Sequence, residues 1–64
     1  MKTSKELKEL RGDKIAELEA IKDIASAEDR DLSEAENQEV DTLLGGVDTL
    51  DEKIKRADKI EANL

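Results

Sequence analysis

Residues 40–64 read VDTLLGGVDTLDEKIKRADKIEANL. Apolar residues recur through this stretch at alternating steps of three and four, which is the a/d spacing of a heptad repeat, and only Glu61 interrupts the pattern. This spacing predicts one face of a long helix that packs against another helix. We interpret this face as a self-association seam. Its predicted residues are Val40, Leu43, Val47, Leu50, Ile54, Ala57 and Leu64.

The composition limits how the chain can build a core. Its 64 residues include no Cys, His, Pro or aromatic residue. Disulfides and Cys/His zinc sites, which stabilise many domains of this size, are therefore excluded. Leu, Ile, Val and Ala must form the core, and we expect self-association or a longer polypeptide to complete it. We predict no cofactor and no metal site.

The charge balance bears on the partners. Charged residues make up 45% of the chain, and the net charge is -7. This acidity disfavours nucleic acid and anionic membrane surfaces, because both are bound mainly through Lys and Arg. No apolar run approaches the roughly 20 residues of a transmembrane helix, and no signal-peptide core follows Met1. We expect a cytoplasmic protein that binds neither nucleic acid nor membrane.

The first helix is predicted over residues 4–28. Its apolar residues fall on one stripe at 100° per residue, flanked by Ile15 and Ile24. Lys14 lies within the stripe, and we expect its aliphatic stem to cross the seam while its ammonium group stays in water. The packing stripe consists of Leu7, Leu10, Leu18, Ile21 and Ala25.

A short elbow, residues 29–33, precedes a strong helix-start signal. Ser33 is a favourable N-cap and Glu36 lies three residues later, which predicts a capping box and a second helix over residues 34–63. Because the connection is short, the two helices should be antiparallel neighbours. The sequence therefore predicts a single all-α domain over residues 1–64, a helical hairpin or coiled coil.

Gly45 and Gly46 lie in the middle of the second predicted helix. Two glycines cost about 2 kcal/mol relative to alanines in a helix interior. A continuous but weakened helix is the favoured interpretation, and a hinge or kink at this pair is the alternative.

Charge is distributed unevenly along the chain. Residues 1–14 carry five bases and three acids, residues 32–52 carry seven acids and no base, and residues 53–64 carry four bases and two acids. A hairpin would thus be acidic at its elbow and mildly basic at its free ends. Second helices from two chains, laid antiparallel, would match acid against base.

No motif in the chain predicts catalysis. Ser4, Ser26 and Ser33 have no His to activate them, and two helices without aromatic residues form no pocket that could separate the pKa values of paired carboxylates. The tripeptide Arg11-Gly12-Asp13 falls inside a predicted helix and is interpreted as a chance match to the integrin motif. We predict no enzymatic activity and no catalytic residue.

Asp29, Asp31 and Ser33 imitate the first ligands of an EF-hand calcium loop. The sixth position is Glu34 where Gly is needed, and the twelfth is Val40 where a bidentate Glu is needed. A helix cap is the favoured interpretation of this segment.

Three runs follow the first amphipathic helix in order: Arg30-Asp31-Leu32-Ser33-Glu34-Ala35-Glu36, then Val40-Asp41-Thr42-Leu43-Leu44, then the run from Val47 to Ala57. This order resembles the N-terminal delta, or scaffolding, domain of major capsid proteins from tailed bacteriophages of the Hong Kong type. The resemblance spans nearly the whole chain. Val40 stands where this family often has Phe, and Gly45-Gly46 replaces good helix formers.

The resemblance implies a structural role in virion assembly. A delta domain acts as a built-in scaffold inside the immature procapsid, in the host cytoplasm, and is removed by a phage maturation protease before DNA packaging. Its implied partners are other copies of the segment, as a homo-oligomer, and other capsid subunits. The alternative is a small acidic helical regulatory protein of the antitoxin or DNA-mimic type, which acts on a basic partner.

Overall fold

The first helix begins at a capping box. In the computed structural model, which describes residues 1–64, helix α1 spans Ser4–Ala27 and Thr3 is its N-cap. The Thr3 hydroxyl accepts a hydrogen bond from the Glu6 N–H, and the Glu6 carboxylate accepts one from the Thr3 N–H. These bonds satisfy N–H groups that a helix start leaves unpaired. The hydrogen bond from the Thr3 backbone N–H is also the main cause of the lowered pKa of the Glu6 carboxyl group. The apolar stripe predicts this helix but not its cap, although Thr3 and Glu6 have the capping-box spacing.

The second helix, α2, spans Glu34–Ala62 and begins at the predicted cap. The Ser33 hydroxyl accepts a hydrogen bond from the Glu36 N–H at 3.1 Å, and Glu36 Oε1 accepts one from the Ser33 N–H at 2.9 Å. Asn63, which was expected to lie inside the helix, is its C-cap. Differences of one residue at helix ends are ordinary.

A residue in the left-handed conformation ends α1. Glu28 is the C-cap, and Asp29 follows with a φ of 50°. The Asp29 N–H donates to the Ser26 carbonyl, and the Arg30 N–H donates to the Ala25 carbonyl. Together these bonds form a Schellman motif, where Gly is usual and Asp is tolerated because its short polar side chain fits the left-handed region. The chain then turns through the elbow that the sequence predicts.

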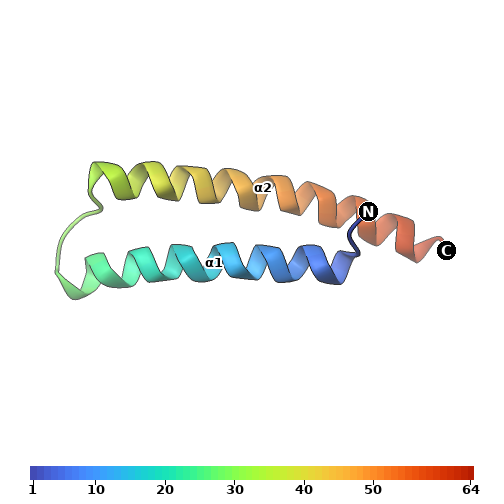
Figure 1. Ribbon diagram of the computed structural model, residues 1–64, viewed down its shortest axis with the longest axis horizontal. Helices are drawn as coiled ribbons and strands as arrows, with labels where there is room; N and C mark the ends of the chain where they lie inside the picture. The colour runs from blue at the N-terminus through green and yellow to red at the C-terminus, as the bar shows by residue number, and fades with distance from the viewer.

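The two helices lie side by side and antiparallel, as Figure 1 shows. The molecule measures 50 by 17 by 13 Å. Because α2 has 29 residues and α1 has 24, the last turns of α2 extend beyond the start of α1 (Figure 1). The predicted all-α fold and helical hairpin are confirmed.

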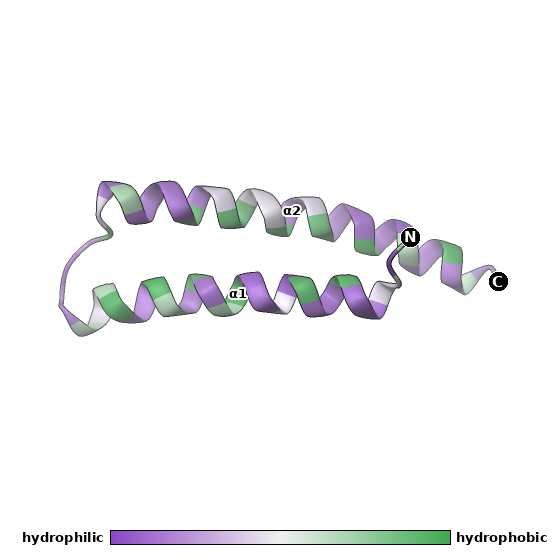
Figure 2. Cartoon of the chain, in the orientation of Figure 1, coloured by the Kyte–Doolittle hydropathy of each residue, from purple (hydrophilic) through white to green (hydrophobic).

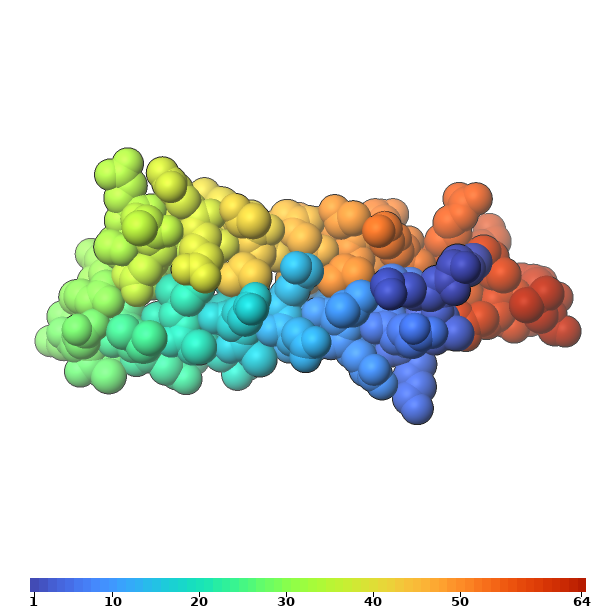
Figure 3. All heavy atoms as spheres, in the orientation of Figure 1, coloured from blue at the N-terminus to red at the C-terminus, as the bar shows by residue number.

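The core is a thin line of aliphatic side chains between the helices. Leu7, Leu50 and Ala57 form a buried cluster, and Ile54 packs against it. Only 7 of the 64 residues are buried, so most of each helix surface remains in water. Apolar residues recur along both helices between hydrophilic ones (Figure 2), and side chains fill the space between the two ribbons (Figure 3).

Helix α2 runs without interruption through Gly45 and Gly46. The predicted continuous helix is therefore confirmed, whereas a hinge role for this pair stays a prediction. The two glycines have different surroundings. A Cβ added at Gly46 would lie 2.9 Å from Lys14 Cε, while a Cβ at Gly45 would meet no atom within 4 Å. The Lys14 stem thus lies across α2 at Gly46, as the stripe pattern led us to expect.

This difference yields a matched pair of variants. Gly45→Ala should stabilise the hairpin by about 1 kcal/mol, because alanine is the better helix former and the new methyl group meets open space. Gly46→Ala should gain less, because its methyl group displaces the Lys14 stem. Urea denaturation followed by circular dichroism measures both changes. Equal gains in the two variants would contradict the contact between Lys14 and Gly46.

Candidate functional site

Most of the predicted self-association seam lies inside the hairpin. Helix α1 covers its central part, while Leu64 is 100% exposed on the overhang of α2. A second chain could reach the covered residues only if the hairpin opened, so association through this seam stays a prediction. The buried seam residues are Leu43, Val47, Leu50 and Ala57, and the half-buried ones are Val40 and Ile54.

The predicted stripe of α1 faces the core with one deviation. Leu7 and Ala25 are buried, and Leu18 and Ile21 are half-buried. Leu10 is 39% exposed, because the line from Leu7 through Lys14 to Ala25 faces α2 and Leu10 lies beside that line.

A polar cluster joins the free ends of the helices. The Ser4 N–H donates to Glu61 Oε2 at 2.8 Å, and the Ser4 hydroxyl donates to Asp58 Oδ1. Ser4 is buried, and Lys8 Nζ lies 3.6 Å from Asp58 Oδ1. Glu61 therefore interrupts the heptad pattern of α2 because it binds the first turn of α1, where the helix dipole also favours a negative charge. The heptad pattern shows the interruption at Glu61 but does not identify its partner.

An ion pair also joins the middle of the two helices. Arg11 Nε donates to Asp51 Oδ1 at 2.7 Å, and both side chains are about four-tenths exposed. An exposed pair of this kind contributes at most about 1 kcal/mol. The pair matters mainly for geometry: it shows that Arg11 of α1 and Asp51 of α2 lie on the same side of the hairpin.

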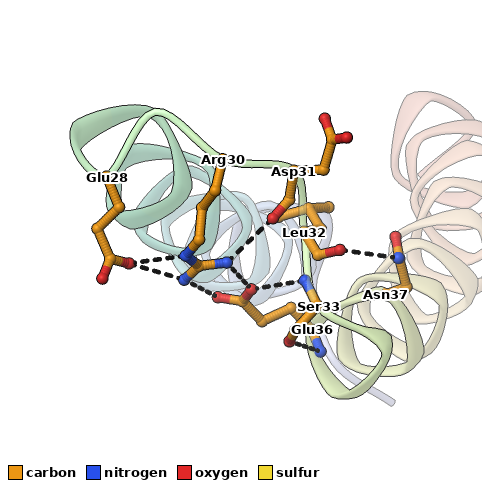
Figure 4. A network of polar contacts seen from close by, with 7 residues as sticks. All are labelled: Glu28, Arg30, Asp31, Leu32, Ser33, Glu36 and Asn37. Atoms are coloured by element: carbon orange, nitrogen blue, oxygen red, sulfur yellow. Dashed lines mark hydrogen bonds and ion pairs between the residues drawn. The ribbon is translucent and has the colours of Figure 1, made fainter.

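Arg30 organises the acidic elbow, as Figure 4 shows. Its guanidinium group lies 2.8 Å from Glu28 Oε2 and 2.7 Å from Glu36 Oε1, and it donates to the Asp31 carbonyl at 3.1 Å. Arg30 is the only base between Asp23 and Glu52. This clamp joins the end of α1 to the start of α2. The cap and the apolar stripes do not predict this clamp, although a single base within a long acidic stretch is a visible signal in the sequence.

The clamp changes the ionisation of its members. The Arg30 hydrogen bonds, followed by the one from the Ser33 N–H, lower the pKa of Glu36 from its ordinary value of 4.5 to about 2. The hydrogen bonds to Glu36 and Glu28 raise the pKa of Arg30, so the guanidinium stays charged. Because the folded-state pKa of Glu36 is depressed, the stability it contributes is complete above about pH 4.5 and is lost as the pH falls through about 2.

Glu36→Gln should therefore destabilise the hairpin at neutral pH, and its difference from the wild type should shrink towards pH 2. Glu39→Gln is the control, because it removes one negative charge from α2 at a residue that makes no ion pair within the chain. Denaturant titrations at several pH values measure the free energy of unfolding. If the difference in free energy of unfolding between the wild type and Glu36→Gln did not depend on pH, the ion pair between Arg30 and Glu36 would be contradicted.

The remaining surface offers no concentrated chemical centre. No group of three or more acidic residues is arranged to hold a metal ion. Neither helix combines the length and the hydropathy that a membrane span requires. Protein-family models, curated proteins and solved structures contain no match to this chain.

Proposed function

We propose that this chain is a structural assembly module, a built-in scaffold at the N-terminus of a phage major capsid protein. The observation that carries the proposal is the ordered resemblance from the capped Ser33 start to Ala57, set on a helical hairpin. In this role the segment lies inside the procapsid, in the host cytoplasm, and holds subunits in register during assembly. A maturation protease then removes it.

Physical features of the hairpin are compatible with this role. A core of six buried aliphatic residues gives a marginally stable element, which suits a segment that must later be cut and released. A net charge of -7 would repel DNA entering the shell, which is a physical reason to remove the segment before packaging. Contacts between helices can hold capsid subunits in register, and this role requires no catalytic group.

The test uses the full capsid protein that carries this segment. Deletion of residues 1–64 should abolish uniform procapsids in electron micrographs. The point variant Leu50→Asp, which removes a buried leucine from the hairpin, should have the same effect, whereas Leu44→Asp, at an exposed leucine of the same helix, should assemble normally. Uniform procapsids from the deleted protein would exclude a scaffolding role.

An acidic regulatory protein that occupies a basic groove is the second candidate. The exposed acids Glu34, Glu39, Asp41, Asp48 and Glu52 on α2 favour it. Two further acids of this helix, Glu36 and Asp51, are engaged by Arg30 and Arg11 within the chain. A stable complex between the isolated chain and a basic protein encoded beside it, measured by calorimetry, would favour this candidate over the scaffold.

A further inference from the structure

One flank of the hairpin, which we name the Lys14 flank, carries two rows of residues at seven-residue spacing. Residues seven apart lie on nearly the same face of a helix. The Lys14 stem crosses to Gly46, so the rows of the two helices lie on the same side of the molecule. The rows are Leu10, Glu17 and Ile24 on α1, and Glu39, Gly46, Lys53 and Ile60 on α2.

The Lys14 flank collects most of the exposed large apolar side chains. Leu10 is 39% exposed, Ile24 is 54% and Ile60 is 37%. Met1 joins Ile60 around a hollow of about 420 Å³, and the N-terminal residues, dark blue in Figure 3, lie over the C-terminal half of α2. Leu44 lies on the opposite flank, because it is seven residues before Asp51, the partner of Arg11. The apolar surface is thus concentrated on one side, as expected of an interaction surface.

Unpaired charges make one half of the Lys14 flank basic and the other half acidic. At the free end, Lys2, Lys53 and Arg56 line the hollow beside Met1, and none of them forms an ion pair within the chain. Towards the elbow, Glu39 is likewise unpaired, and Glu17 lies between Leu10 and Ile24. A second copy turned end for end therefore brings basic residues towards acidic ones.

We propose that two copies of the chain pair antiparallel through the Lys14 flank, with α1 against α1 and α2 against α2. A two-fold axis near Glu17 places Leu10 of each copy opposite Ile24 of the other. The two Glu17 side chains then face each other, and each lies about one turn from the other copy's Lys14, which offsets their repulsion. The opposite arrangement, with both free ends together, would gather Lys2, Lys53 and Arg56 of both copies at one end and is disfavoured by repulsion. This pairing rests on the proposed assembly role, in which a second copy of the chain is the partner.

The size of the flank is sufficient for such a pair. The face that contains both helices measures 50 by 17 Å. A specific interface typically buries about 800 Å² on each partner, which is comparable to this face. Pairing would cover Leu10 and Ile24, bring Ile60 to the level of the other copy's elbow, and form a four-helix bundle with a second layer of core.

Disulfide trapping tests the pairing in the isolated 64-residue chain, which contains no native cysteine. The variants are Leu10→Cys, Ile24→Cys and, as a control on the opposite flank, Leu44→Cys. Under mild oxidation, an equal mixture of Leu10→Cys and Ile24→Cys should form covalent dimers at least about ten-fold faster than either variant alone, because only the mixed pair comes within disulfide distance. Circular dichroism of the reduced variants checks that each remains helical.

Sedimentation provides the second measurement. Ile24→Asp should weaken the dimer by about ten-fold or more, whereas Leu44→Asp, an equivalent change on the opposite flank, should leave it unchanged. Faster cross-linking of a single variant than of the mixture would overturn the antiparallel geometry. A monomer at all concentrations, or equal effects of the two Asp variants, would overturn the pairing surface. A pair that forms in the isolated chain while deletion of residues 1–64 leaves procapsids normal would reject the scaffold role alone.

Discussion

Leu50→Asp should unfold the hairpin. Leu50 is a member of the buried cluster with Leu7 and Ala57. Removal of a buried leucine side chain costs about 2–5 kcal/mol, and an unpaired carboxylate in its place adds a further desolvation cost. A 64-residue domain has a total stability of only about 3–10 kcal/mol. The loss should therefore exceed what this thin core can absorb, and far-UV circular dichroism should show a largely unfolded chain.

Leu44→Asp is the matched control. Leu44 lies in the same helix but is 46% exposed, so the same substitution should change the free energy of unfolding by less than about 0.5–1 kcal/mol. The comparison also distinguishes a seam that is buried within one hairpin from a seam that is buried between two chains. If Leu50→Asp yielded a folded monomer, as expected for a seam between chains, the burial of Leu50 within one hairpin would be wrong.

Ala57→Leu should have the second-largest effect. Ala57 is 0% exposed, and it lies in the cluster beside Leu7 and Leu50 where the helices meet. Three additional carbon atoms would have to push the helices apart or force neighbouring side chains from their preferred rotamers. Such overpacking typically costs about 1–3 kcal/mol. Denaturant unfolding should show this loss as a lower midpoint with a similar slope.

Ala16→Leu provides the corresponding control in α1. Ala16 is exposed, and leucine is nearly as good a helix former as alanine, so the change should stay within about 0.5 kcal/mol. An Ala57→Leu variant as stable as Ala16→Leu would mean that the helices do not approach closely at Ala57.

The helices themselves could be predicted from local sequence. The spacing of Val40, Leu43, Val47 and Leu50 requires a helical face, and the Ser33 and Glu36 side chains form their capping box across only three residues. Such signals depend on the backbone of the same segment. They predicted the second helix to within one residue at its end and the antiparallel order of the pair. The Thr3 cap belongs to the same class of local signal, because Thr3 and Glu6 have the capping-box spacing.

The partners of the side chains depended on the tertiary structure. A heptad seam has the same spacing whether it is covered by the same chain or by another, so the burial of Val47 and Leu50 under α1 could not be read from periodicity. Glu61 and Ser4 are 57 residues apart in sequence, and Arg11 and Asp51 are 40 apart. These contacts arise only when the elbow sets the register of the two helices, because a polar pair at such separation leaves no local pattern. The local sequence therefore determines where each helix begins and ends, whereas packing between the helices decides which face is buried and which flank remains open to a partner.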